Sequence, residues 1–250
     1  MKFKKVLCAA LALVSCMSLA SCGEKPTEKY IISSDSSFAP FEFLDEEKGV
    51  YTGVDMDLVA AIAEDQKFEY EMKNEGFKAA MGSVQSGQSD AMIAGMSISD
   101  ERKQTFDFSD SYFDDGQILV TTPDSDIKSE ADLKGKKVAA KNGTLSLEYT
   151  ESIKDKYGFE ISYYEDSPSM YQAVISGVND ACFEDYSVIA WAIKSEGVKL
   201  HTIGEVINPA GYGFAVKKGE NAELIEKFNA GLKNIKANGK YKEILSKYGY

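Results

Sequence analysis

The stretch VQSGQSDA at residues 84–91 returns as VISGVNDA at residues 174–181. Each copy has the pattern of a helix end, a glycine that stops the helix, an acidic turn and the start of a strand. Any two βαβ units share these signals, so the repetition can also arise by coincidence. We interpret it as the mark of two lobes of similar build, with one copy in each lobe.

Around these two stretches, short apolar runs of β-type residues alternate with helical patterns. Residues 30–32 and the alternating run 68–72 indicate strands, and the apolar residues of 58–63 share one helical face. Strand and helix in alternation favour an α/β fold with largely parallel sheets. Further strands are expected at 91–94, 118–121, 137–140, 161–164, 181–183, 200–203 and 213–216, and helices at 144–156, 168–176, 186–196, 220–237 and 240–247.

Both copies of the repeated stretch lead into a strand whose carboxyl end carries polar groups. These ends are residues 95–97 in one copy and Glu184 and Asp185 in the other. Open α/β sheets bind ligands outside the carboxyl ends of their strands. If the two sheets face each other, the two segments line opposite walls of one cleft.

The first 22 residues have the composition of an export signal. Lys2, Lys4 and Lys5 precede an apolar run at 6–19, which is shorter than the about 20 residues that a membrane-spanning helix needs. The run ends in LASC, which resembles a bacterial lipobox and makes Cys22 the expected lipidation site, with 23–28 as a tether. LVSC at 13–16 is a rival match, but cleavage there would leave apolar residues on the mature chain. Cleavage without lipid, or an uncleaved anchor, is the alternative.

Cysteine content and charge narrow the class of protein. Cys8 and Cys16 leave with the leader and Cys22 carries lipid, so only Cys182 remains and no intramolecular disulfide can form. The roughly 228 remaining residues are enough for one large or two modest packed domains. The net charge is −12 and there is no basic run, which excludes nucleic acid and bare anionic lipid as partners.

The sequence lacks the usual motifs of an enzyme or a metal site. Its one histidine, His201, falls in an expected strand, where we expect it to pack. There is no Gly-x-Ser-x-Gly elbow, Walker loop, Rossmann glycine pattern or Cys/His metal spacing, and the acidic run 45–47 is expected to be a solvated hairpin tip. We therefore expect no catalytic residues, no cofactor and no metal.

Arg102 is the only arginine among 28 basic side chains. It follows an expected strand and begins a helical turn that Ser99 would cap. A guanidinium group binds a carboxylate through two parallel hydrogen bonds, and N–H groups at a helix start add to the attraction. The alternative is a surface arginine paired with Asp100 or Asp107.

Four stretches occur in an order that is typical of one known family. They are SSDSSFAPFEF at 33–43, GVDMDL at 53–58, AGMSISDER at 94–102 and FDFS at 106–109. Together they make the chain resemble the polar amino-acid family (family 3) of bacterial extracellular solute-binding proteins, the receptors of ABC importers. Within that family it is most similar to glutamine-binding members, through KNGT at 141–144 and Asp35.

The resemblance implies a two-lobed, type II periplasmic-binding-protein-like α/β fold, with the second lobe inserted into the first and the ligand in the interlobe cleft. Lobe 1 would comprise 29–112 and 213–250 and lobe 2 would comprise 117–208. The hinge would be formed by the turn-like, glycine-bearing segments 113–116 and 209–212. The resemblance further implies a monomeric receptor, lipid-anchored on the outer face of the cytoplasmic membrane or periplasmic, that serves a permease with a cytoplasmic ATPase.

By motif match, nine residues take over the family's ligand-binding roles. Arg102 would hold the α-carboxylate with help from Ser97 and Thr144. Asp185 would take the α-ammonium group, with Gly95 and Ser97 as further acceptors. The nine residues are Asp35, Phe38, Phe77, Gly95, Ser97, Arg102, Lys141, Thr144 and Asp185.

Four of these residues would contact the ligand side chain. Phe38, which lies in a turn-rich segment and is expected at the rim, would sandwich the aliphatic part with Phe77. Asp35 and Lys141 would meet its far end. Two residues depart from the family pattern. Leu145 stands in place of a glycine, which puts the pocket shape there in doubt, and Glu184 stands where histidine or aspartate is more usual.

The pair at the far end predicts the ligand. Asp35 accepts hydrogen bonds and Lys141 donates them, so a neutral carboxamide satisfies both. A cationic side chain would face Lys141 and an anionic one Asp35, at a cost of several kcal/mol in a closed cleft. Glutamine is therefore the expected ligand, and asparagine, one methylene shorter, fits less well. The alternative is that Asp35 and Lys141 simply bridge each other and that specificity lies elsewhere.

Two other functions share this fold. Some relatives are dehydratases of cyclic carboxylic acids, in which case Glu184 would be a general acid. The combination of Asp35, Asp185 and Phe77 suits a zwitterion better than such a substrate. The lobe pair could also serve a sensor rather than a transporter, a choice that the binding chemistry does not make.

Overall fold

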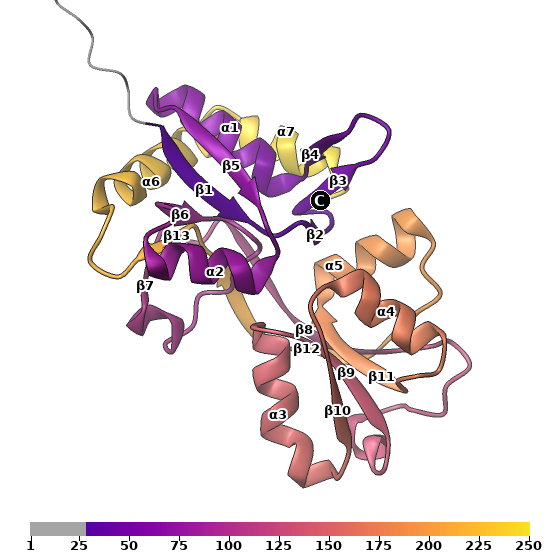
Figure 1. Ribbon diagram of the computed structural model, residues 1–250. Helices are drawn as coiled ribbons and strands as arrows, with labels where there is room; N and C mark the ends of the chain where they lie inside the picture. Colours follow the sequence, from indigo (N-terminus) through magenta and orange to yellow (C-terminus); the bar gives the residue numbers. More distant parts are fainter. Residues whose placement is uncertain (1–28) are drawn as a thin grey trace, which may run out of the picture.

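The computed structural model describes residues 29–250. The expected leader, the lipidation site at Cys22 and the tether lie outside these residues. The described chain forms two lobes, each built on a five-stranded sheet with helices on both faces, joined by the long strands β8 (Phe113–Thr121) and β12 (His201–Tyr212) (Figure 1). Within residues 29–250, no helix is both long enough and apolar enough to cross a bilayer.

The first lobe has the strand order β5-β1-β6-β13-β7. Strand β1 runs parallel to β5 and β6, and β13 runs antiparallel to β6 and β7. Helices α1, α6 and α7 cover one face and α2 the other. The elements are β1 (Tyr30–Ser34), α1 (Val54–Gln66), β5 (Tyr70–Asn74), α2 (Phe77–Ser86), β6 (Ala91–Met92), the 3₁₀ turn η1 (Arg102–Gln104), β7 (Phe106–Phe108), β13 (Ala215–Lys217), α6 (Ala222–Ala237) and α7 (Lys240–Lys247).

The second lobe has the strand order β10-β9-β11-β8-β12, with β9 parallel to β10 and β11. Helix α3 covers one face, and α4 and α5 cover the other. The elements are η2 (Glu130–Leu133), β9 (Lys137–Lys141), α3 (Leu145–Tyr157), β10 (Glu160–Tyr164), α4 (Ser167–Ile175), β11 (Ala181–Asp185), α5 (Tyr186–Trp191) and the π turn η3 (Ala192–Glu196).

A third, three-stranded sheet projects from the first lobe. It consists of β2 (Ser37–Phe38), β3 (Glu42–Asp45) and β4 (Val50–Thr52). The tip between β3 and β4 is exposed, which confirms the expected solvated hairpin at Glu46 and Glu47.

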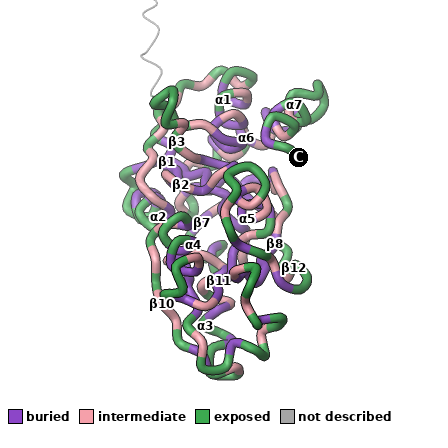
Figure 2. Tube along the Cα trace, turned by 90° about the vertical axis from the view of Figure 1, so that its right-hand side faces the viewer, coloured by how far each residue is buried: buried purple, intermediate pink, exposed green. Residues whose placement is uncertain are grey.

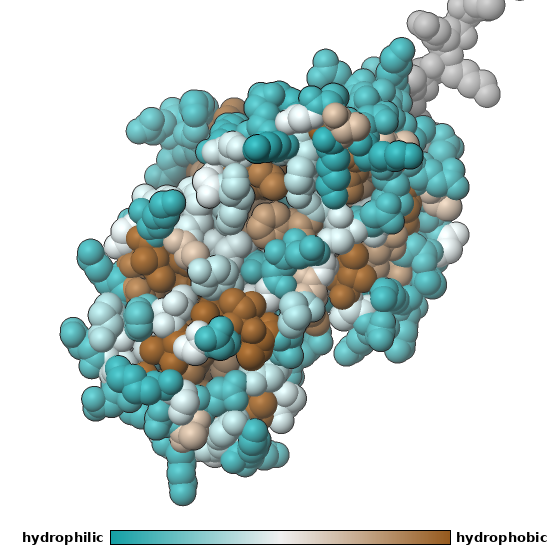
Figure 3. Space-filling model, turned by 180° about the vertical axis from the view of Figure 1, so that it is seen from behind, coloured by the Kyte–Doolittle hydropathy of each residue, from teal (hydrophilic) through white to brown (hydrophobic). Residues whose placement is uncertain are grey.

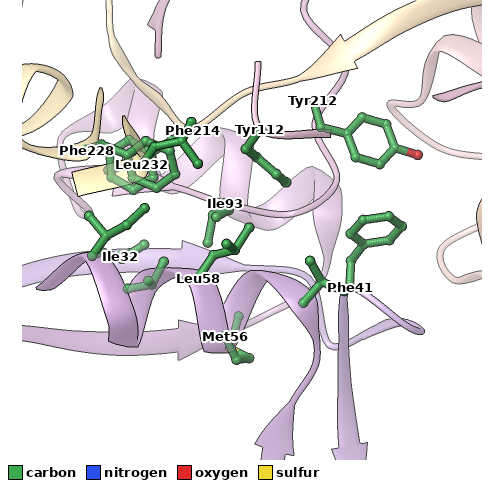
Figure 4. Packing of buried hydrophobic residues seen from close by; sticks show 14 of the residues in the cluster. Ile32, Phe41, Met56, Leu58, Ile93, Tyr112, Tyr212, Phe214, Phe228 and Leu232 are labelled. Carbon is green, nitrogen blue, oxygen red and sulfur yellow. The ribbon is translucent and has the colours of Figure 1, made fainter. Parts of the chain in front are cut away.

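Apolar packing holds each lobe together. In the first lobe, the rings of Phe214 and Phe228 stack with their centroids 4.4 Å apart, among Ile32, Leu58 and Leu232 (Figure 4). Two further clusters lie on either side of the second sheet. Buried residues follow the strands and the inner faces of the helices (Figure 2). Hydrophilic residues cover most of the face seen from behind, and the apolar side chains on that face gather mainly over the second lobe, in the lower half of the view (Figure 3).

The repeated stretch has the same structure in both lobes. In each copy a helix is followed by a glycine with positive φ, 76° at Gly87 and 75° at Gly177, and a strand begins at the alanine. The aspartate of each copy accepts a hydrogen bond from the main chain of a neighbouring strand. Asp90 Oδ2 accepts from the N–H of Ile31 in β1, and Asp180 Oδ2 accepts from the N–H of Lys137 in β9, each at 2.8 Å.

The segments between the lobes differ from the expectation. They are turn-like in the prediction, whereas the structure shows paired strands, with Tyr212 of β12 opposite Phe113 of β8. Strand β12 is longer than the expected 200–203, because it follows β8 from the second sheet, with bulges around Ile207, to Tyr212, which bridges to Ser97 of the first lobe. Their role as a hinge stays a prediction. His201 lies in β12 as expected but is exposed, so its expected packing role is wrong.

Candidate functional site

A small cavity lies between the lobes at the carboxyl ends of their strands. Its volume is about 20 Å³, which is room for about one water molecule. An amino acid can therefore enter only if the lobes move apart. Its lining contains eight of the nine expected ligand residues, and Asp35 lies just outside it. The lining residues are Phe38, Phe77, Ala94, Gly95, Ser97, Arg102, Lys141, Thr144, Leu145, Glu184 and Asp185.

Arg102 is buried at the first turn of η1, with 6% of its surface exposed. Its main-chain N–H donates to Ser99 Oγ at 3.2 Å, as the expected cap requires. Nη1 donates to the Ser97 carbonyl at 2.8 Å, and Nη2 reaches the other lobe and donates to the Gly143 carbonyl at 2.9 Å. The guanidinium carbon lies 5.4 Å from the ring centre of Phe77.

The alternative of a surface arginine is wrong. Asp100 pairs with Lys103 at 3.1 Å, and Asp107 pairs with Lys218 at 2.5 Å. Burial lowers the pKa of Arg102, while the nearby charges of Glu148 and Asp185 oppose that shift. Because a guanidinium group has five N–H donors and two are used here, others remain for an anion in the cavity.

Asp185 ends β11 on the opposite wall. The Tyr212 hydroxyl donates to its Oδ2 at 2.5 Å and also lies 3.1 Å from Asp115 Oδ2. Burial, with the charges of Glu184 and Asp115, raises the pKa of Asp185 to about 8. Figure 4 shows the hydroxyl of Tyr212 pointing away from the apolar cluster. No sequence pattern points to Tyr212 or Asp115, because their proximity to Asp185 depends on the path of β8 and β12 between the lobes.

Lys141 and Asp35 form an ion pair across the lobes. Lys141 Nζ lies 2.5 Å from Asp35 Oδ2, and the two side chains are 2% and 1% exposed. Burial lowers the pKa of Lys141, but the charges of Asp35 and Glu184 outweigh it and the pKa is raised overall. Nζ also lies 4.6 Å from the ring centre of Phe38. The two residues do bridge each other in this structure, which was the alternative to a direct role in ligand recognition.

Thr144 is the N-cap of α3, whose start lies at the cavity. Its Oγ1 accepts from the N–H of Leu147 at 3.1 Å and donates to the Lys141 carbonyl at 2.8 Å. The Thr144 hydroxyl proton is therefore already used in a hydrogen bond. At this side of the cavity an anion would be attracted by the main-chain N–H groups at the N-terminus of α3.

Gly95 and the two phenylalanines shape the walls. Gly95 has φ 52°, and a Cβ there would lie 2.5 Å from the ring of Phe38, so a side chain does not fit. Phe38 and Phe77 are each 5% exposed. Phe38 is therefore a buried wall residue and not the expected rim residue, because it packs against the core of the first lobe.

Two buried acids behind Gly95 had no expected role. Asp55 Oδ2 accepts from the Gly95 N–H at 2.8 Å and from the Tyr112 hydroxyl at 2.9 Å. Burial raises the pKa of Asp55 to about 7. Burial, with the charges of Asp55 and Asp35, raises the pKa of Glu42 well above its usual value. Glu42 lies in the motif 33–43 and Asp55 in the motif 53–58. An acidic residue flanked by apolar residues is the sequence pattern that could have indicated a buried carboxyl group at each position.

In residues 29–250 no group of three or more His, Cys, Asp or Glu side chains is placed to hold a metal ion. Cys182 is buried in the second lobe.

The chain is similar to amino-acid-binding proteins over its described length. The model of a family described as bacterial extracellular solute-binding proteins, family 3, matches residues 30–250. A probable histidine-binding protein of Neisseria gonorrhoeae is 30% identical, over 99% of this chain and 96% of the relative. The ABC transporter glutamine-binding protein GlnH of Bacillus subtilis is 31% identical, over 97% of this chain and 93% of the relative.

Two solved structures bear on the arrangement of the lobes. An ancestral arginine-binding protein bound to arginine has a TM-score of 0.82 at 36% identity, covering 89% of this chain and 98% of its own. The second substrate-binding domain of Lactococcus lactis GlnP, in an open conformation, has a TM-score of 0.61 at 45% identity, covering 90% and 97%. The more similar sequence has the lower score, as expected when rigid lobes differ by a rotation. The lobes here are arranged more like those of the ligand-bound protein.

Proposed function

Because the chain belongs to the bacterial extracellular solute-binding proteins of family 3, whose members bind free amino acids and work with ABC transporters, we propose that it binds glutamine in the interlobe cavity. One observation carries the proposal. The only arginine of the chain, Arg102, and the half-buried carboxyl group of Asp185 line the same cavity from opposite lobes. An α-amino acid offers one group of each charge and would be held by both lobes at once.

The α-carboxylate would bind to the free N–H groups of Arg102 and to the start of α3 beside Thr144. The α-ammonium group would bind to Asp185, with the Gly95 carbonyl and the Ser97 hydroxyl as further acceptors. Each charged group of the ligand would then have a partner of opposite charge, which a buried charge requires. The ligand favours the closed arrangement because only there do both lobes contact it.

The side chain would lie between Phe38 and Phe77 and separate Lys141 from Asp35. Parting these two residues leaves one donor and one acceptor buried without partners. The carboxamide of glutamine restores both contacts, with its carbonyl toward Lys141 and its NH₂ group toward Asp35. Arginine brings a second cation to Lys141, and glutamate brings a second anion to Asp35.

Calorimetric titration of the purified chain with glutamine, asparagine, histidine, arginine and glutamate tests this assignment. We expect glutamine to bind with the lowest Kd and to give the largest rise in Tm. A lower Kd for histidine, arginine or glutamate would show that the assignment to glutamine is wrong. Binding of no amino acid would reject the binding function itself.

We further propose that the protein is anchored by lipid at Cys22 and passes its ligand to a permease with a cytoplasmic ATPase. Replacing Cys22 by serine should release the protein from the membrane fraction, and continued membrane retention would contradict the anchor. A sensor role predicts ligand-dependent signalling without uptake of labelled glutamine. A dehydratase predicts turnover of prephenate or arogenate that is lost in Glu184→Gln.

A further inference from the structure

Glu184 is a buried carboxyl group at the cavity for which the proposed binding mode has no role. It is 3% exposed. The Tyr171 hydroxyl donates to its Oε2 at 2.8 Å, and the main-chain N–H of Asp185 donates to its Oε1 at 2.9 Å. Burial raises the pKa of Glu184, while the charge of Lys141 and these two hydrogen bonds favour the charged carboxylate and oppose that shift.

The pairing of β9 and β11 brings Glu184 next to Lys141. These parallel strands place Ala181 opposite Val138 and Cys182 opposite Ala139. The same register, continued to the strand ends, places Glu184 opposite Lys141. The backbones of neighbouring strands are about 5 Å apart, and the two side chains lie on the same face of the sheet. The charge of Glu184 accordingly favours the charged form of Lys141.

The side-chain end of the cavity therefore carries an excess of negative charge. Lys141 is the cation there, and Asp35 and Glu184 are the anions. Arg102 and Asp185 would be matched by the ligand's own α-groups, so they leave this excess unchanged. A ligand side chain meets the field of two carboxylates and one ammonium group.

We propose that the charge of Glu184 shifts the preference of the site away from anionic and toward cationic side chains, in a site that still binds glutamine with the lowest Kd. This inference rests on the proposed function that the cavity binds a free amino acid. Glu184 acts through its charge beside Lys141, while Asp35 and Lys141 contact the ligand. A like charge placed in a desolvated cleft is unfavourable, so the discrimination due to Glu184 is about tenfold or more in the ratio of two Kd values.

Glu184→Gln tests the proposal, because it removes the charge and keeps the shape of the side chain. Calorimetry gives Kd for glutamine, glutamate and arginine with the wild type, with Glu184→Gln and with Glu151→Gln. The control removes the same charge from an exposed position on α3 of the same lobe. In Glu184→Gln we expect the Kd of glutamate relative to glutamine to fall about tenfold and that of arginine relative to glutamine to rise. In Glu151→Gln both ratios should stay within about twofold, because water and salt screen a surface charge.

Ratios that stay constant in Glu184→Gln, even if all three Kd values rise together, would overturn the proposal and leave Glu184 a structural residue. Glu184→Asp keeps the charge and should keep the wild-type ratios. If Glu184→Gln does not fold, as judged by its thermal unfolding, Glu184→Ser removes the same charge and must show the same change in ratios. A wild-type protein that binds none of the three amino acids would overturn the proposed function first, which is a different result from binding with unchanged ratios.

Discussion

Asp185 is the cavity side chain whose protonation an amino acid would change most. Burial and two neighbouring carboxyl groups, Glu184 and Asp115, raise its pKa to about 8. Near neutral pH the group therefore carries a proton for much of the time. A ligand ammonium group beside Asp185 would favour the charged form, so the carboxyl group would lose this proton on binding.

We expect ligand binding to release close to one proton near pH 7. Because the raised pKa means that the free protein holds the proton below about pH 8, Kd should fall as pH rises from about 6 to about 8, by at most about tenfold per pH unit, and then level off. Calorimetry in two buffers of different ionisation enthalpy counts the protons. Asp155 is exposed, so Asp155→Asn should release the same number of protons as the wild type. A binding enthalpy that is equal in both buffers would show that no proton is released and would contradict the assignment of Asp185.

At the scale of secondary-structure elements, a glycine lets helices α1 and α6 pack closely. A Cβ added at Gly231 of α6 would lie 2.7 Å from Cγ2 of Ile62 in α1. Gly82 of α2 offers the opposite case, because a Cβ there would have no atom within 4 Å. The two glycines share a helical environment and differ in the space around them.

Alanine at these two positions should therefore change stability in opposite directions. Gly231→Ala should lower the free energy of unfolding by about 1–3 kcal/mol, because the added methyl group overpacks the helix interface. Gly82→Ala should raise it by about 0.5–1 kcal/mol, because alanine loses less conformational freedom in a helix. Urea unfolding without ligand measures both changes. An unchanged or raised free energy of unfolding in Gly231→Ala would show that packing at Gly231 is not tight.

At the scale of the whole molecule, the ion pair between Lys141 and Asp35 joins the lobes. It is almost completely buried and its atoms are 2.5 Å apart. Removing one partner of a buried pair leaves an uncompensated charge, which costs about 3–5 kcal/mol. The protein can avoid this cost by opening the cleft and letting water reach Asp35. The pair thus stabilises the closed arrangement before any ligand binds.

Lys141→Met should shift the ligand-free protein toward an open arrangement. We expect its radius of gyration, measured by small-angle X-ray scattering, to exceed that of the wild type. Lys103→Met removes a lysine from an exposed pair with Asp100 within one lobe and should leave the radius unchanged. Equal radii for Lys141→Met and the wild type would mean that the pair does not hold the lobes together.

The sequence was sufficient for features that depend on neighbours along the chain. The order of strands and helices follows from periodicity, and the two turns at 84–91 and 174–181 follow from glycine and aspartate at fixed positions. The single arginine identified one residue of the cavity, because one residue type stood out against a lysine-rich background. The conclusion that two walls meet at the strand ends followed from the geometry of α/β sheets.

The tertiary structure decided what depends on contacts between distant segments. Strand β12 runs from the second sheet to the first lobe and brings Tyr212 to Asp185. The parallel pairing of β9 and β11 brings Glu184 beside Lys141. Burial, which is a property of the packed molecule, raises the pKa values of Asp55 and Asp185. The sequence by itself determined the architecture and the chemical groups at the cleft. Only the folded chain decided which of those groups meet and which are charged, because desolvation and register act through space and not along the sequence.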